Sequence, residues 1–235
     1  SPRKVGTGAG VDTDLLSRNS ECLVFGIDIG GGIEIAYERF RDNLRVCLAQ
    51  ADLSRLPFRE GFFDVISCDQ VLHHSSDPPR NFSHLVSRLA PEGRIVLYVY
   101  KIKGALREFA DDHLRMAVIN ASHEDAIRVG RSMADLGREL QAIDGEITIS
   151  ADIPELGIEA GRYKVQQFVY DHILKCFWND RFDEETNTMV NFDWYRPCHA
   201  FRYTREQVEE WVQRDGLELL HIDISPSGIS IIARR

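Results

Sequence analysis

A single acid at the end of an apolar run is the first group in this chain that could do chemistry. Residues 23–30 read Leu-Val-Phe-Gly-Ile-Asp-Ile-Gly, and a helix-like segment follows at 33–40. Such a run predicts a buried strand whose end reaches the carboxyl edge of a parallel sheet, where open α/β sheets bind ligands. The Asp28 carboxylate suits a ribose diol there, because two adjacent hydroxyls can donate to its two oxygens. The alternative is that Asp28 caps the next helix.

A glycine-rich loop, Val-Gly-Thr-Gly-Ala-Gly at 5–10, lies upstream of this acid, and its last glycine is 18 positions before Asp28. Glycines let the backbone approach a ligand closely, and this interval is near that between the glycine loop and the ribose-binding acid of dinucleotide folds. The nicotinamide fingerprint has its third glycine one position later, where this chain has Val11, so NAD is the second choice. Only 3–5 precede the loop, a segment too short and too charged for a central strand.

Polar side chains also follow the next predicted strands. Asp52 directly follows the segment 44–51, and Asp69 directly follows the buried strand predicted at 65–68. The loop after it contains His73 and His74, and histidine is the side chain that most readily titrates near neutrality. Either imidazole could act as a base for a hydroxyl or amine substrate. The alternative is that the loop side chains only satisfy backbone groups.

Helices alternate with these strands. Asp77 followed by proline predicts a helix start, with an apolar face at 82–89 before the strand 94–100. Thr204 to Gln207 is a capping box that predicts a helix with Trp211 in the core. Strand, helix and strand at this rhythm predict right-handed parallel crossovers, and so an α/β fold.

Six short motifs occur in a fixed order along residues 5–100. They are Gly6-Thr7-Gly8-Ala9-Gly10, Gly26-Ile27-Asp28, Gln50-Ala51-Asp52-Leu53 with Leu56-Pro57-Phe58, Phe63-Asp64-Val65-Ile66, Val71-Leu72-His73-His74 and Leu89-Ala90-Pro91-Glu92-Gly93-Arg94. As an ordered set they resemble the class I S-adenosylmethionine-dependent methyltransferases. The resemblance is closest to the type-11 small-molecule group, which includes quinone-biosynthesis enzymes, and it resumes at the C-terminus.

The resemblance implies a Rossmann-like, doubly wound sheet of seven strands in the order 3-2-1-4-5-7-6, with the last strand antiparallel. The segments 217–224 and 229–233 fit its terminal hairpin. Residues 1–100 and 203–235 would then form the S-adenosylmethionine-binding core. One departure is Lys4, because the family usually has an acid there that helps hold the methionine ammonium.

The resemblance also implies a cofactor site. Asp28 would bind the ribose hydroxyls, Asp52 would accept from the adenine amino group, and Ile29 would lie against adenine. Asp69 and Gln70 would border the transferred methyl. The full implied cofactor set is Gly6, Gly8, Gly10, Asp28, Ile29, Asp52, Leu53, Asp69 and Gln70.

Residues 101–202 are an insertion far longer than a connecting loop. Helical spacing at 106–119, 126–140 and 163–178 predicts a largely helical segment whose apolar stripes form its own core. Its aromatic-dense parts could form a lid that excludes water and shapes an acceptor pocket. The candidate substrate-binding residues are Tyr100, Trp178, Asp193, Trp194, Tyr195 and His199.

Composition narrows the partners. The net charge of −9 disfavours nucleic-acid binding, which needs clustered basic residues. No apolar run approaches membrane-spanning length, and the five cysteines have no disulfide or zinc spacing, so we expect a soluble, cytoplasmic protein without a metal. Oligomeric state is open.

Three functions fit these observations. The first is transfer of a methyl group from S-adenosylmethionine to a small molecule by in-line displacement, leaving S-adenosylhomocysteine. The second is a nicotinamide-dependent oxidoreductase, which the glycine spacing and the second acid at Asp52 disfavour. The third is a catalytically silent, cofactor-binding protein on the same fold, suggested by Lys4 and the short first strand.

Overall fold

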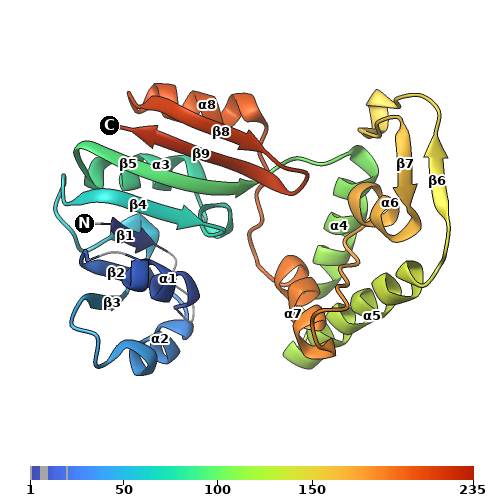
Figure 1. The fold of residues 1–235 in the computed structure, drawn as a ribbon, viewed down its shortest axis with the longest axis horizontal. Coiled ribbons are helices and arrows are strands. Elements are labelled where there is room, and N and C mark those ends of the chain that lie inside the picture. The colour runs from blue at the N-terminus through green and yellow to red at the C-terminus, as the bar shows by residue number, and fades with distance from the viewer. Residues whose placement is uncertain (1, 6–9, 20) are drawn as a thin grey trace. The chain divides into compact units, whose positions relative to one another are not determined.

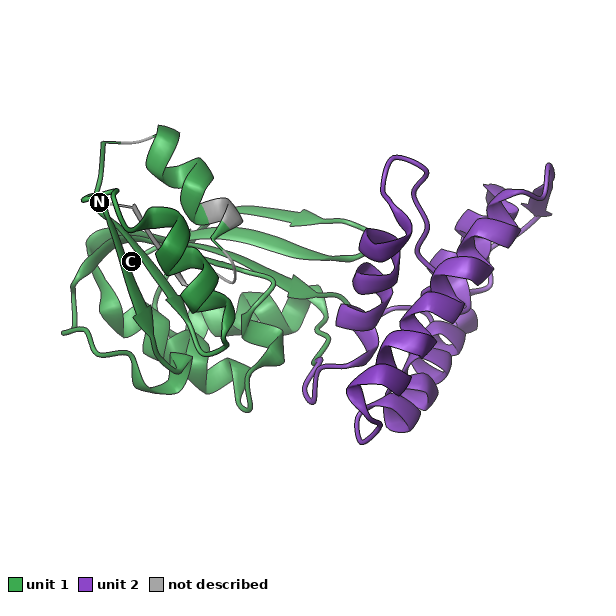
Figure 2. Cartoon of the chain, turned by 90° about the horizontal axis from the view of Figure 1, so that it is seen from below, with its two compact units in different colours: residues 1–101, 201–235 green, residues 102–200 purple. Residues whose placement is uncertain are grey.

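The chain divides into two compact units. The computed structural model describes residues 2–5, 10–19 and 21–235. Unit 1 comprises residues 1–101 and 201–235, and unit 2 comprises residues 102–200, which Figure 2 colours green and purple. Among the described residues, no helix has both the length and the apolar character needed to cross a membrane.

Unit 1 is built on a mixed five-stranded sheet in the order β1-β4-β5-β9-β8 (Figure 1). Its first three strands are parallel, and β9 is antiparallel to both β5 and β8, so the predicted C-terminal hairpin is confirmed. β2 and β3 form a separate parallel pair, and β2 lies beside β1 (Figure 1). The strands are β1 (Pro2–Val5), β2 (Val24–Asp28), β3 (Val46–Gln50), β4 (Phe63–Asp69), β5 (Leu89–Tyr100), β8 (Glu218–Ile224) and β9 (Gly228–Arg234).

The short segment before the glycine loop forms a strand despite its charge. β1 pairs in parallel with β4 over all four of its residues, from Pro2 opposite Val65 to Val5 opposite Cys68. The ladder uses backbone groups, which every residue except proline supplies in full, so local composition did not exclude this pairing. β5 likewise begins at Leu89, five residues before the predicted strand start.

The core of unit 1 contains inward-facing strand residues and two helices, α3 (Pro78–Arg88) and α8 (Arg205–Arg214). Asp77 accepts a hydrogen bond from the Arg80 N–H at 3.2 Å, and the capping box at Thr204 is present. Trp211 is 5% exposed, as predicted. The remaining helical elements of unit 1 are α1 (Val11–Asn19), α2 (Gly32–Phe40) and the 3₁₀ turns Leu53–Arg55 and Leu72–His74.

Unit 2 is largely helical. Its helices α5 and α7 pack closely against each other at Gly130. A Cβ at this position would lie only 2.9 Å from the Thr188 carbonyl oxygen of α7. The elements of unit 2 are α4 (Ala105–Val118), α5 (His123–Gln141), α6 (Val165–His172), α7 (Glu184–Tyr195), the antiparallel hairpin β6 (Glu146–Ile149) with β7 (Gly161–Lys164), and the 3₁₀ turn Pro154–Leu156.

The face that α4 buries is not the predicted one. The sequence predicted that the apolar stripe of 106–119 is core, but Phe109 and Met116 are 74% and 75% exposed. The helix instead buries Arg107, Asp111 and Arg115. These side chains lie at intervals of four residues, so they share one face, and their charges are compensated inside the unit.

Candidate functional site

The ends of β2 and β3 bring two acidic segments together. Asp28 is the last residue of β2 and lies opposite Gln50, the last residue of β3. The Asp28 carbonyl oxygen accepts a hydrogen bond from the Ala51 N–H at 3.0 Å, and the Gln50 amide donates to the Ile29 carbonyl oxygen at 3.1 Å. Asp52 follows directly, so both acids lie at one edge of this parallel pair.

Each acid is oriented by its own loop. Asp28 Oδ1 accepts from the Gly30 N–H at 2.8 Å, whereas the N-cap of α2 is Gly31, without a side-chain cap. The alternative that Asp28 is the N-cap of the next helix is therefore wrong. Asp52 Oδ1 accepts from the Ser54 N–H at 2.8 Å and caps a 3₁₀ turn. A carboxylate has further acceptor sites, so both could also hold hydroxyl or amino groups of a nucleoside.

Gly10 is the described glycine of the predicted loop; Gly6 and Gly8 lie outside the described residues. Its φ is +88°, and a Cβ there would meet the Phe40 ring at 2.6 Å. Its carbonyl oxygen accepts from the Asp14 N–H at 2.9 Å and so begins α1. Because other residues rarely adopt this backbone conformation and no space is left for a side chain, glycine is required here.

Apolar surfaces accompany these acids. Ile29 is 67% exposed beside Asp28, whereas Leu53 is 9% exposed and belongs to the core of unit 1. Ile29 could therefore contact a flat ring, while Leu53 could contribute its backbone N–H.

The end of β4 carries the third acid. Asp69 is half-buried and lies opposite Tyr98 of β5. The next residue, Gln70, has a φ of 57°, in the left-handed region that a side chain such as glutamine rarely adopts. Such outliers are maintained by their surroundings and cluster at functional sites.

A group of aromatic rings follows this edge. His73 and Tyr100 stack with centroids 3.7 Å apart, and His74 lies edge-on to Tyr100 at 5.4 Å. His73 is fully buried and its carbonyl oxygen accepts from the Phe201 N–H, whereas His74 is half-buried. Of the two histidines, His74 is therefore the one that solvent reaches.

Tyr98 belongs to this group, although the sequence analysis did not select it. Burial raises the pKa of Tyr98, the Asp69 carboxylate adds to the rise, and a hydrogen bond with the Ser227 side chain opposes it. The phenol therefore stays protonated near neutrality and can donate. The sequence could have indicated Tyr98, because Tyr98 and Tyr100 are two residues apart on a strand and therefore share one face.

The family comparison concerns unit 1. The methyltransferase domain family matches residues 4–97. Residues 4–97 are therefore similar to a methyltransferase domain. A curated but uncharacterised protein of Synechococcus is 33% identical over 139 residues, which cover 54% of this chain and 33% of that protein. The chain thus spans about a third of that relative's length.

Solved structures share the fold of the methyltransferase domain at low identity. An S-adenosylmethionine-dependent methyltransferase from Mesorhizobium loti is 15% identical, with a TM-score of 0.56 and coverage of 99% of this chain and 90% of its own. A Burkholderia thailandensis 1,6-didemethyltoxoflavin N1-methyltransferase, solved with bound 1,6-didemethyltoxoflavin and S-adenosylhomocysteine, is 12% identical with a TM-score of 0.53. The similarity covers 99% of this chain and 69% of that protein's chain.

The other predicted substrate residues lie in unit 2, outside the methyltransferase domain match. Trp194 and Tyr195 are 4% and 1% exposed and meet at the buried Asp111 carboxylate, whereas Asp193 and His199 are exposed. Trp178 lies elsewhere: its indole N–H donates to Asp180 at 2.7 Å, and Arg138 lies 5.2 Å from its ring. A cavity of about 580 Å³ in unit 2 is lined by 140–144 and 162–167, and so by none of these residues.

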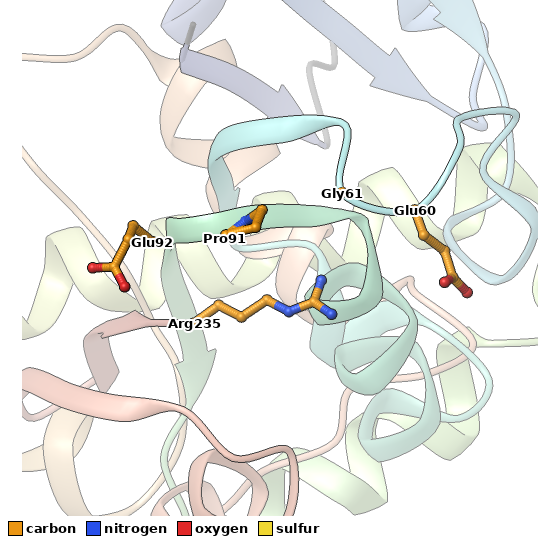
Figure 3. Close-up of a pocket in the computed structure, with 5 residues that line it drawn as sticks. All are labelled: Glu60, Gly61, Pro91, Glu92 and Arg235. Carbon is orange, nitrogen blue, oxygen red and sulfur yellow. The ribbon is translucent and has the colours of Figure 1, made fainter.

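A further pocket lies away from the carboxyl edge. Its volume is about 460 Å³, and its lining residues are Glu60, Gly61, Pro91, Glu92 and Arg235 (Figure 3). Gly61 precedes β4 and Pro91 is near the start of β5, so this pocket is at the amino ends of the parallel strands. The Arg235 guanidinium donates to the carbonyl oxygens of 86, 87 and 89. Open α/β sheets bind ligands at the opposite, carboxyl edge, so we assign no cofactor to this pocket.

Proposed function

We propose that this chain transfers a methyl group from S-adenosylmethionine to a small-molecule acceptor by in-line displacement. The observation that carries the proposal is the pair of acids at the ends of neighbouring parallel strands, Asp28 on β2 and Asp52 after β3. A sulfonium cofactor supplies an activated methyl group when bound. The chain's own task is to align donor and acceptor and to exclude water.

In this proposal Asp28 accepts the ribose hydroxyls, and Asp52 accepts the adenine amino group beside the Leu53 N–H. The loop contacts of both acids fix their direction, and exposed Ile29 offers an apolar surface to the ring. Gly10 allows close approach of the backbone. The roles of Gly6 and Gly8 stay predictions, as does the effect of Lys4.

We further propose that the acceptor reacts beside the end of β4. Asp69, Gln70 and Tyr98 border this point, and the protonated Tyr98 phenol can donate to an acceptor oxygen or nitrogen. His74 takes the acceptor's proton in this scheme, because it is the more exposed histidine. The buried His73 and the stacked Tyr100 position it.

Two finer features belong to the same proposal. The neighbouring positions of β2 and β1 support one continuous seven-stranded sheet in the family order 3-2-1-4-5-7-6 (Figure 1). Unit 2 would determine the acceptor, as the predicted lid of residues 101–202. Membership of the type-11 small-molecule group and a cytoplasmic location stay predictions.

The test is isothermal titration of the full chain with S-adenosylmethionine, S-adenosylhomocysteine and NAD in parallel. We expect both sulfur nucleotides to bind and NAD not to bind. An assay for S-adenosylhomocysteine release over a panel of small hydroxyl, amine and carbon acceptors then identifies the acceptor. Binding of NAD alone would overturn the proposal, and tight binding without turnover on any acceptor would favour the silent, cofactor-binding alternative.

A further inference from the structure

The turn between β8 and β9 lies against the Tyr98 ring. Gly228, the first residue of β9, pairs with Tyr100, so this turn is at the carboxyl end of β5. A Cβ on Gly228 would lie 2.2 Å from Tyr98 Cζ and 2.4 Å from the phenol oxygen. A side chain at this position would displace the ring, so the phenol rests directly on the Gly228 backbone.

Hydrogen bonds within the turn fix this surface. The Ser225 N–H donates to the Gly228 carbonyl oxygen at 3.0 Å, and the Gly228 N–H donates to Ser225 Oγ at 3.1 Å. The Lys101 N–H donates to the Ser227 carbonyl oxygen at 3.4 Å, which joins the turn to the end of β5. Ser225 Oγ also lies 3.2 Å from Ser227 Oγ, so the Ser227 hydroxyl is held in the same network.

The Ser227 hydroxyl forms a hydrogen bond with the Tyr98 phenol. Burial raises the pKa of Tyr98, and this bond opposes the rise, as a donor to the phenol oxygen does by stabilising the phenolate. Ser227 thus occupies a lone pair of the phenol oxygen and leaves the phenol's own hydrogen for another acceptor. Among the described residues, the Tyr98 hydroxyl donates to no protein acceptor.

Other groups of the proposed acceptor site lie around the same ring. Asp69, the last residue of β4, pairs with Tyr98 in the parallel ladder. The Tyr98 ring centroid is 6.3 Å from that of Tyr100 and 6.4 Å from that of His73, and both pairs are edge-on. The turn at 225–228 therefore reaches the edge of the sheet where open α/β folds bind ligands.

We propose that Ser227 and Gly228 are positioning residues, which hold the Tyr98 phenol as a hydrogen-bond donor to the methyl acceptor. The acceptor accordingly carries an oxygen or nitrogen lone pair at the methylated atom or beside it. This inference rests on the proposed methyl transfer, and it adds the C-terminal hairpin to the acceptor site. The two residues act through Tyr98, because the serine orients the phenol and the glycine leaves space for it.

Fluorine NMR of the full chain tests the positioning without any acceptor. With 3-fluorotyrosine at its seven tyrosine positions, the Tyr98 signal is the one that is absent in Tyr98→Phe. We expect Ser227→Ala to move the titration of this signal to higher pH, because the bond that opposes the raised pKa of Tyr98 is lost. Ser227→Thr keeps a hydroxyl and should restore the titration of the parent chain.

Gly228→Ala should change the chemical shift of the Tyr98 signal, because the added Cβ would overlap the ring. Gly145→Ala is the glycine control, since a Cβ there meets only contacts at 3.9 Å. Ser87→Ala is the serine control and removes a hydroxyl that bonds the backbone of α3. Both controls should keep the parent's Tyr98 signal. If Ser227→Ala and Gly228→Ala also kept it, the turn would not position the phenol and the inference would be wrong.

The role in methyl transfer is measured as kcat and KM on the acceptor that the panel identifies. Tyr98→Phe should lower kcat about 10-fold and Ser227→Ala about fivefold, with the KM for S-adenosylmethionine unchanged. Since Ser227 acts through Tyr98, adding Ser227→Ala to Tyr98→Phe should cause no further loss. A merely structural role would instead give losses that multiply in the double variant.

Two kinetic results would contradict the inference: an unchanged kcat in Ser227→Ala, or independent losses in the double variant. A parent chain that bound no S-adenosylmethionine would refute the proposed function itself, and with it the assignment of Tyr98 to an acceptor. The fluorine signals would still decide whether the turn positions the phenol, so the two failures are distinguishable.

Discussion

The two units bury their side chains in opposite ways. Unit 1 has an apolar core and leaves acids such as Asp28 and Asp52 at the ends of its strands. Unit 2 buries charged side chains on α4, with Arg107 and Asp111 each 1% exposed. An apolar core is stable when its side chains have suitable volumes and the right hydrophobic pattern. A buried ion pair is stable only while both charged groups and their hydrogen-bond partners are present.

The buried or loop-held acids of the two units also differ in how far away their hydrogen-bond partners lie in the sequence. The Asp28 and Asp52 side chains each bond an N–H two residues further on. Asp111 instead binds Lys175, Trp194 and Tyr195, which are 64, 83 and 84 positions away in the sequence. The acids of unit 1 are held by their own loops, whereas the Asp111 carboxylate of unit 2 links segments far apart in the sequence.

The largest effect is expected from Asp111→Ala. Removing this carboxylate deletes the 2.7 Å ion pair of the buried Arg107 and the acceptor that the Lys175 backbone N–H and the Trp194 indole N–H share. We expect the free energy of unfolding, measured by urea denaturation, to fall by about 3–5 kcal/mol. Asp144→Ala, at an exposed position of the same unit, is the control. If the Asp111→Ala variant had the same denaturation midpoint as the parent, the conclusion that unit 2 depends on its buried charges would be wrong.

Two aromatic truncations test which apolar residues are core. Trp211→Ala should cost about 3–5 kcal/mol, because its side chain is 5% exposed and lies in the apolar core beside Phe82 of α3. Phe109→Ala should change stability by no more than about 0.5 kcal/mol, because that ring is 74% exposed. The same urea experiment measures both, and equal losses would mean that the apolar stripe of α4 is buried after all.

Asp28→Ala tests the proposed role of this acid of unit 1 in binding the cofactor. The loss of two charged hydrogen bonds to the ribose should weaken S-adenosylmethionine binding by about 100-fold, with the melting temperature unchanged. Asp42→Ala removes an exposed acid just after α2 and should bind like the parent. Near-parental affinity in Asp28→Ala would remove this residue from the site.

The smallest effect is the pH dependence that Lys175 imposes on stability. Its pKa in the folded chain is about 7, against an ordinary 10.5, so above pH 7 the unfolded chain holds more protons and stability rises with pH. From pH 7 to 8 the rise should be about 1 kcal/mol in the parent, with Lys175→Met flatter by that amount. Urea midpoints at both pH values, with Lys164→Met as control, measure it. An equal slope in Lys175→Met would contradict the assigned pKa.

Many elements could be predicted from short stretches of sequence. The cap at Asp77, the capping box at Thr204, the buried Trp211 and the C-terminal hairpin are all confirmed. Each depends on residues within a few positions of one another, through periodicity or hydrogen bonds to adjacent backbone. The ordered motifs of residues 5–100 indicated a resemblance to methyltransferases, and the methyltransferase domain family matches almost the same range, residues 4–97.

The sequence by itself therefore determined the α/β class, the similarity of residues 4–97 to a methyltransferase domain and the order of the acids along the strands. Tertiary structure decided that β1 pairs with β4, that Tyr98 joins the rings beside Asp69, and that α4 buries its charged face. The physical reason is distance along the chain. The buried Arg107 pairs with Asp111, and Asp111 is itself held by side chains of a helix some 80 residues away in the sequence. A local sequence pattern cannot predict a contact between residues so far apart.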